Sequence, residues 1–362
     1  MVSAPAGEPA PGGDPRLGER VGDFLIEAPI ADGGVARVYL ARHVSSGAEV
    51  AVKVLRDEAA SEPVAIERFR REFETAFGLV HPHIVKAREF GRAEDGSNFM
   101  IMELLGGEPL SALLAREGAL EPERALRFVC QIAAALEHAH SFGVIHRDLK
   151  PENIFLSASD DGARVQLLDF GSVKLQLEMG PKLTAYGMTL GSPSYMAPEQ
   201  AEGLGDLDQR ADVFALAAVT YEMLTGEVAF DGVDAGTVLA KILRGRPTPM
   251  RERDPSLPLG IDVVIAAGLM RDKARRTGSA RELAEALLRV FGLEPDVERY
   301  GSLPLAAWPR LRPAQSVPGR EAAAGGGAHA GGSPGPGRLG RWALMSLGGA
   351  ALASAALAYL LT

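Results

Sequence analysis

Short runs rich in branched apolar residues occupy the first third of the chain. Residues 24–26, 35–40 and 50–55 form such runs, which predict antiparallel strands, and residues 99–105 predict a further, buried strand. Residues 1–19 differ, because they are rich in Pro, Gly and Ala and lack the apolar stretch of a signal peptide. We therefore expect a disordered N-terminal arm before the first strand.

Longer patterns with helical spacing follow these strands. Residues 66–77 form a helical run, and Pro122 suits the first position of a helix in which apolar side chains recur at helical spacing. Residues 212–225 are largely apolar, which predicts a buried central helix. A helix over 280–290 is expected to close the folded domain, which we place at residues 20–293.

The C-terminal part changes in composition twice. Residues 294–340 are rich in Pro, Gly and Ala, which predicts a flexible linker. Residues 341–362 then contain a long stretch without charged side chains, enough for a helix of roughly 30 Å, the thickness of a bilayer core. Arg338 and Arg341 precede it, so we expect a transmembrane helix that keeps the preceding domain in the cytoplasm. A soluble alanine-rich helix remains the alternative.

Composition narrows the possible partners. The chain has 362 residues, is 46% hydrophobic and carries a formal charge of -9, so it can bury a large core, and neither nucleic acid nor anionic lipid is expected to bind its main body. Its one cysteine, Cys130, excludes an intramolecular disulfide and a cysteine-rich zinc site. Cys130 shares the apolar side of the predicted helix with Leu126 and Val129, which indicates a buried structural thiol.

One polar segment combines several chemical groups. The sequence HRDLKPEN at residues 146–153 offers a carboxylate, an ammonium group and an amide close together, and DFG follows at 169–171. Phosphoryl transfer needs these groups, because a carboxylate orients the attacking hydroxyl, oxygen atoms bind magnesium, and fixed positive charge stabilises the phosphate. The segment therefore indicates phosphoryl transfer.

These motifs, with APE at residues 197–199, resemble the eukaryotic-type (Hanks-type) serine/threonine protein kinases, in particular their bacterial branch. The resemblance implies an α+β bilobal protein-kinase fold. One lobe would be small, antiparallel and β-rich with one key helix, and the other larger and mainly helical. A C-terminal transmembrane helix would be added to this fold.

The resemblance also assigns catalytic roles. Asp148 would be the catalytic base, and Lys150 would lie beside the transferred phosphate and mark the serine/threonine branch. Lys53 would bind the phosphates of ATP and form an ion pair with Glu72. Without the resemblance, Glu72 could equally be a solvated charge on a helix.

The same resemblance implies ATP and Mg²⁺ as cofactors, with Mn²⁺ as a substitute for Mg²⁺. Asn153 and Asp169 would be the metal ligands. Met102 would be the gatekeeper beside the adenine. The expected nucleotide contacts are Ile30, Gly33, Gly34, Val38, Ala51, Lys53, Met102, Glu103 and Leu105.

The expected nucleotide loop departs from the family pattern. Ala31 and Ala36 stand where the family has its first and third glycines, and Ala31 could stiffen the loop and weaken nucleotide binding. Judged alone, Gly33 and Gly34 could equally form a plain hairpin turn.

Further residues acquire roles from the resemblance. Arg147 would read a phosphorylated activation segment, for which Thr184 and Thr189 are the candidate phosphosites. Asp212 would brace the backbone of the catalytic loop. Arg276 would pair with the carboxylate of Glu199, although Thr277 replaces the proline that usually follows. Ser192 would be a structural hydroxyl.

Together these features predict an ATP-dependent serine/threonine kinase in signal transduction that acts on protein substrates and is bound to a membrane. Two alternatives remain, a pseudokinase scaffold and a small-molecule phosphotransferase of related fold. Small residues recur every four positions at Ser346, Ala350, Ser354 and Ala358, which would let two membrane helices pack closely as a homodimer. A plain alanine-rich anchor is the alternative to dimerisation.

Overall fold

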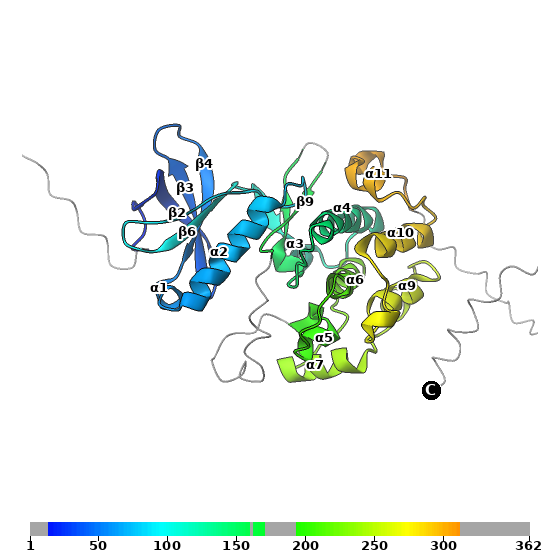
Figure 1. Cartoon of the computed structure of the whole chain (residues 1–362). Helices are drawn as coiled ribbons and strands as arrows, with labels where there is room; N and C mark the ends of the chain where they lie inside the picture. Colours follow the sequence, from blue (N-terminus) through cyan, green and yellow to red (C-terminus); the bar gives the residue numbers. More distant parts are fainter. Residues whose placement is uncertain (1–13, 160–161, 171–192, 312–362) are drawn as a thin grey trace, which may run out of the picture. The chain divides into compact units, whose positions relative to one another are not determined.

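The computed structural model describes residues 14–159, 162–170 and 193–311 (Figure 1). The candidate phosphosites Thr184 and Thr189, and also Ser192, lie outside these residues. Every helix in the described ranges is too short or too polar to cross a bilayer. The membrane helix expected at 341–362 lies outside the described part of the chain.

The N-terminal lobe is built on an antiparallel sheet. Its elements are β1 (Arg20–Val21), β2 (Phe24–Asp32), β3 (Ala36–His43), β4 (Glu49–Leu55), α1 (Asp57–Ala60), α2 (Pro63–Gly78), β5 (Ala87–Arg92) and β6 (Asn98–Met102). The six strands pair in the order β1-β2-β3-β4-β6-β5. Helix α2 covers one face of the sheet (Figure 1), where Phe69 packs with Leu55 and Met100. This lobe confirms the predicted β-rich lobe with one key helix.

The C-terminal lobe is mainly helical. Its helices are α3 (Leu110–Glu117), α4 (Pro122–Ser141), α5 (Pro198–Ala201), α6 (Arg210–Thr225), α7 (Ala235–Arg244), α8 (Met250–Arg253), α9 (Ile261–Gly268), α10 (Ala280–Val290) and α11 (Val297–Ser302). Its strands β7 (Gly107–Pro109), β8 (Ile154–Ser157) and β9 (Arg164–Leu167) form a small antiparallel sheet, and its short 3₁₀ turns are η1 (Pro151–Asn153), η3 (Pro193–Tyr195), η4 (Lys273–Arg275) and η5 (Leu305–Ala307).

Helix α6 is the centre of this lobe. It is apolar around its whole circumference, and almost all of its side chains are buried, because α4, α9 and α10 pack around it (Figure 1). The predicted bounds of α10 are confirmed, whereas the predicted strand over 99–105 ends at Met102. Beyond Met102 the chain leaves the sheet and enters the connection between the lobes, which an apolar run alone does not reveal.

The expected linker from residue 294 needs correction over its first part. Helix α11 and η5 fold back against α4, and Val297, Tyr300 and Trp308 are buried in the core of the C-terminal lobe. The Nε2 of Gln131 on α4 donates to the carbonyl oxygen of Gly301 at 2.8 Å. The average composition predicted a linker because Pro, Gly and Ala surround these few large side chains.

The prediction of a disordered arm over residues 1–19 is wrong for its last residues. Residues 14–19 lie along the sheet, where the backbone N–H of Gly18 donates to Ile26 at 2.9 Å and that of Ile26 donates to Glu19 at 3.0 Å. These hydrogen bonds satisfy polar backbone groups that composition alone cannot place.

Candidate active site

Residues 146–153, which the resemblance makes the catalytic loop, follow α4, include η1 and bring three predicted residues together. The Nζ of Lys150 donates to Oδ2 of Asp148 at 2.8 Å, and Nδ2 of Asn153 donates to the same oxygen at 3.0 Å. The Asn153 amide also donates to the backbone oxygen of Asp148 at 2.8 Å. The Asp148 carboxylate is therefore held in one orientation by charge-assisted hydrogen bonds, while its side chain stays one-third exposed.

A buried carboxylate fixes the backbone of this loop. Asp212, at the start of α6, accepts hydrogen bonds from the backbone N–H groups of His146 and Arg147, both at 2.8 Å, and from Nε2 of His140 at 2.7 Å. Burial alone would raise the pKa of Asp212, but the hydrogen bonds from His140 and the backbone hold it below its usual value. The predicted bracing of the catalytic loop by Asp212 is present.

Two non-glycine residues with positive φ flank the site. Arg147 has φ of 69° and Asp169 has φ of 55°, and no other non-glycine residue in the described part of the chain adopts positive φ. Such conformations cost roughly 1–3 kcal/mol each and persist where surrounding contacts fix them. The hydrogen bond from Arg147 to Asp212 is one such contact.

A partly buried charge triad links the two lobes. The Nζ of Lys53 on β4 lies 2.6 Å from Glu72 on α2 and 2.7 Å from Asp169, which follows β9. Burial raises the pKa of Glu72. Burial would also raise the pKa of Asp169, but the ammonium group of Lys53 more than offsets it and leaves that pKa lowered. The predicted ion pair is thus present, and Glu72 is not a solvated helix charge.

Most of the expected nucleotide contacts lie near this triad. Ala51 and Lys53 share one face of β4, where Val38 of β3 lies opposite Lys53 and Met102 of β6 lies opposite Ala51. Ile30, near the end of β2, is half exposed. Gly33 and Gly34 lie in the turn between β2 and β3, and Glu103 and Leu105 lie in the connection between the lobes. Apolar side chains therefore lie beside Lys53, as is usual in sites that bind the flat ring of a nucleotide.

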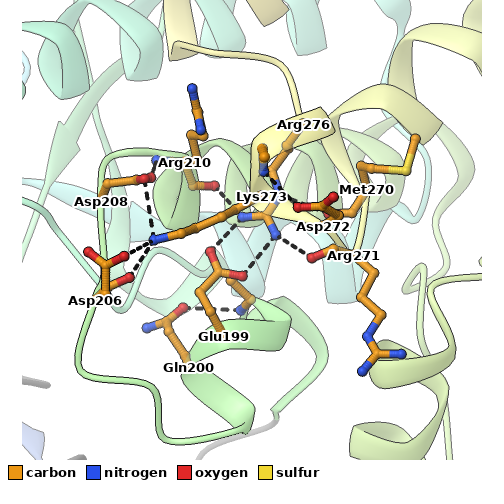
Figure 2. A network of polar contacts seen from close by, with 12 residues as sticks. Glu199, Gln200, Asp206, Asp208, Arg210, Met270, Arg271, Asp272, Lys273 and Arg276 are labelled. Atoms are coloured by element: carbon orange, nitrogen blue, oxygen red, sulfur yellow. Dashed lines mark hydrogen bonds and ion pairs between the residues drawn. The ribbon is translucent and has the colours of Figure 1, made fainter.

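The APE segment is anchored to Arg276, which follows η4 in the C-terminal lobe. Figure 2 shows the guanidinium of Arg276 facing the carboxylate of Glu199, with N–O distances of 2.7 and 2.8 Å. Arg276 also donates to the backbone oxygens of Arg210 at 2.7 Å and Met270 at 2.9 Å. The predicted pair is present, and Thr277 in place of proline does not prevent it.

Residues 24–289 match the protein kinase domain family. This chain belongs to the protein kinase family. Serine/threonine-protein kinase pkn3 of Myxococcus xanthus is 38% identical over 272 residues, which cover 74% of this chain and 50% of pkn3. PknB of Mycobacterium tuberculosis is 36% identical over 286 residues, covering 76% and 45% of the two chains.

Solved structures agree with this assignment. The kinase domain of Mycobacterium tuberculosis PknI matches with a TM-score of 0.60 and 28% identity, covering 76% of this chain and 98% of that domain. The kinase chain spans half or less of the length of pkn3 and PknB. The predicted family and bilobal fold are confirmed, and both relatives named above are bacterial serine/threonine protein kinases.

The kinase site contains groups that suit a magnesium ion. Both hydrogen atoms of the Asn153 amide nitrogen point toward Asp148, which leaves Oδ1 as the atom available to a cation. Asp169 offers a second oxygen besides the one that contacts Lys53. Two oxygen donors suit Mg²⁺, which usually binds few protein oxygens together with nucleotide phosphates and water. The metal roles of both residues remain predictions.

Two residues of the kinase site were missed or undervalued by the sequence patterns. Gln200 donates from Nε2 to the backbone oxygen of Arg147 at 2.7 Å and accepts from the N–H of Ala197 at 3.0 Å, so it joins the APE segment to the catalytic loop. His140 on α4 contacts Asp212 through its Nε2, a role that the helical pattern around it does not indicate. The only local signal for a role of Gln200 is its position directly after the APE motif.

Proposed function

We propose that Asp148 orients the substrate hydroxyl and accepts its proton while Lys150 stabilises the transferred phosphate of ATP. Lys53, held by Glu72, would bind the nucleotide phosphates, and Asn153 and Asp169 would hold Mg²⁺, which neutralises phosphate charge when bound. The observation that supports this proposal is the hydrogen-bonded group of Asp148, Lys150 and Asn153, in which a carboxylate, an ammonium group and an amide lie together. The substrates proposed are serine and threonine residues of proteins in a signalling pathway.

The test is a transfer assay on the full chain with γ-labelled ATP, Mg²⁺ and a generic protein substrate. We expect label on serine and threonine, and its loss when Lys53 is replaced by methionine, which removes the cation of the triad. Mass spectrometry of the active protein should find phosphate on Thr184 or Thr189, because Arg147 would read it. A wild-type chain that transfers no phosphate would instead favour a pseudokinase scaffold.

We also propose that residues 341–362 tether the kinase domain to a membrane and bring two copies together. The uncharged stretch, with Arg338 and Arg341 before it, supports the tether, and the recurring small residues support the dimer. Two tethered domains would share a high effective concentration, which favours phosphorylation of one activation segment by the other copy.

Membrane fractionation of cells that express the full chain tests the tether. The full chain should sediment with membranes and resist extraction by high salt and alkali, whereas a chain ended at residue 340 should be released. Recovery of the full chain in the soluble fraction would contradict the tether. Replacing Ala350 and Ser354 with leucine should keep insertion but reduce crosslinked dimers, and unchanged crosslinking would leave the segment as an anchor without a dimer role.

A further inference from the structure

The turn between β2 and β3 is bounded by a bidentate ion pair. Asp32, the last residue of β2, lies opposite Arg37 of β3 in the strand register. Arg37 donates to the two carboxylate oxygens of Asp32 at 3.1 Å from Nε and 2.7 Å from Nη2. This pair closes the base of the hairpin that holds Gly33 and Gly34, because opposite charges facing each other across two strands favour pairing.

A second arginine contacts the turn itself. Arg56 follows β4, the strand that carries Lys53, and its Nε donates to the backbone oxygen of Gly33 at 2.8 Å. Its guanidinium also pairs with Asp32, and its backbone N–H donates to Val35 at 3.0 Å. Arg56 therefore joins the turn to the strand of the phosphate-binding lysine.

The N-terminal segment completes the same group. Asp14 accepts from Nη1 of Arg37 at 2.7 Å and from the hydroxyl of Tyr39 at 3.1 Å, and its side chain is 10% exposed. The backbone N–H of Arg16 also donates to Asp14 at 3.0 Å. Asp14 is the least exposed acid of the group, so Arg37 connects the hairpin to a fixed point on the lobe.

We propose that Asp14, Asp32, Arg37 and Arg56 form a nucleotide-loop clamp that holds the β2–β3 turn in the conformation that binds ATP. The proposal rests on the proposed ATP-binding role of this turn. The four are positioning residues, because they act through the backbone of the turn.

The physical reason is preorganisation. Backbone N–H groups can surround phosphate oxygens only after the loop is ordered, and each contact formed in advance reduces the entropy lost on binding. Glycine has the largest freedom to lose, and this hairpin has Ala31 and Ala36 where its family has glycine. A β2–β3 turn that has fewer glycines and is held by ion pairs of two arginines is therefore ordered before the nucleotide binds. Gly33 remains necessary, since a Cβ there would lie 2.9 Å from the backbone oxygen of Ala36.

A rival explanation is that Arg37 and Arg56 attract the triphosphate directly. The two explanations predict opposite effects of one substitution on the affinity for ATP. Replacing Asp32 with asparagine removes a negative charge near the phosphates, so direct attraction would strengthen ATP binding. If the carboxylate instead fixes both arginines, the same change loosens the turn and weakens ATP binding.

The experiment measures the ATP dissociation constant by calorimetry, and KM for ATP and kcat by the transfer assay, on the full chain. Asp32→Asn and Arg56→Gln should each raise KM for ATP and the dissociation constant by about 3–10-fold, as expected for loss of partly exposed ion pairs, with kcat within about 2-fold of wild type. The double variant should raise KM for ATP by less than the product of the two single effects, because both changes remove the contact between Asp32 and Arg56.

Two further variants complete the test. Asp14→Asn should raise KM for ATP by about 2–5-fold although Asp14 lies in the N-terminal segment, because Arg37 loses an anchor. Asp23→Asn is the matched control, since it removes an exposed carboxylate that pairs with Arg20 at the other end of β2 and should leave KM unchanged.

The outcomes separate the proposals. Tighter ATP binding by Asp32→Asn would overturn the clamp in favour of direct attraction. Fully additive effects of the two changes would overturn the shared contact of Asp32 with Arg56 on which the clamp depends. Unchanged KM for Asp32→Asn and Arg56→Gln, with wild-type protein that binds ATP, would overturn the clamp alone. Wild-type protein that fails to bind ATP would contradict the proposed function and the clamp with it.

Discussion

Replacing Asp148 with asparagine should lower kcat for phosphoryl transfer by about 10²–10⁴-fold, the usual size of a general-base contribution. The amide cannot take up the proton of the attacking hydroxyl. It keeps one oxygen that can accept from Lys150 or Asn153, the two donors that Asp148 Oδ2 binds at 2.8 and 3.0 Å. The loop should therefore keep its conformation while the reaction slows, and single-turnover transfer measures the change.

The control for this prediction is a second lysine–aspartate pair. Asp231 pairs with Lys241 at 2.5 Å on the exposed surface of the C-terminal lobe, so Asp231→Asn should leave kcat unchanged. The melting temperature and KM for ATP of the Asp148 variant should match those of the wild type. Turnover within a few-fold of wild type would show that Asp148 is not the base.

Sequence motifs predicted which residues lie together in the candidate site, because most of them belong to short patterns of fixed spacing. Lys53, Asp148 and Asp169 lie far apart in the chain, and the family resemblance rather than local periodicity brought them together. The structure then contains the expected contacts of Lys53 with Glu72 and of Asp212 with the catalytic loop. Helix α10 has the predicted bounds, whereas α2 begins three residues earlier and ends one residue later than predicted.

The remaining contacts depend on partners distant in sequence. Gln131 on α4 is polar and buried, which no helical pattern predicts, because its partners are the backbone of Gly301 and of Val165 on β9. Asp14 is a second example. In the sequence it is a polar residue of the expected arm, and only the structure shows its ion pair with Arg37. Local composition gives only the average polarity of a segment. The roles of these residues depend instead on the register of strands and the packing of helices.

Loss of the Arg276 side chain should lower the stability of the kinase domain strongly. Its side chain is fully buried, and its guanidinium satisfies both oxygens of Glu199, which is itself 5% exposed. It also lies 5.2 Å from the centre of the Phe214 ring on α6. Removing one partner of a buried ion pair costs about 3–5 kcal/mol, because the other charge is left buried without compensation.

Arg276→Met should therefore lower the melting temperature of the kinase by roughly 10 °C, since 1 kcal/mol corresponds to about 2–4 °C in a domain of this size class. Scanning calorimetry of the full chain measures it, and Arg271→Met is the control, because the pair of Arg271 with Glu202 is exposed and should contribute less than about 1 kcal/mol. The double variant Arg276→Met with Glu199→Leu should recover part of the loss, because no unpaired carboxylate remains buried. It should not recover all of it, since the backbone oxygens of Arg210 and Met270 still lack their donor. Equal melting temperatures for Arg276→Met and Arg271→Met would show that the buried pair does not hold the APE segment in place.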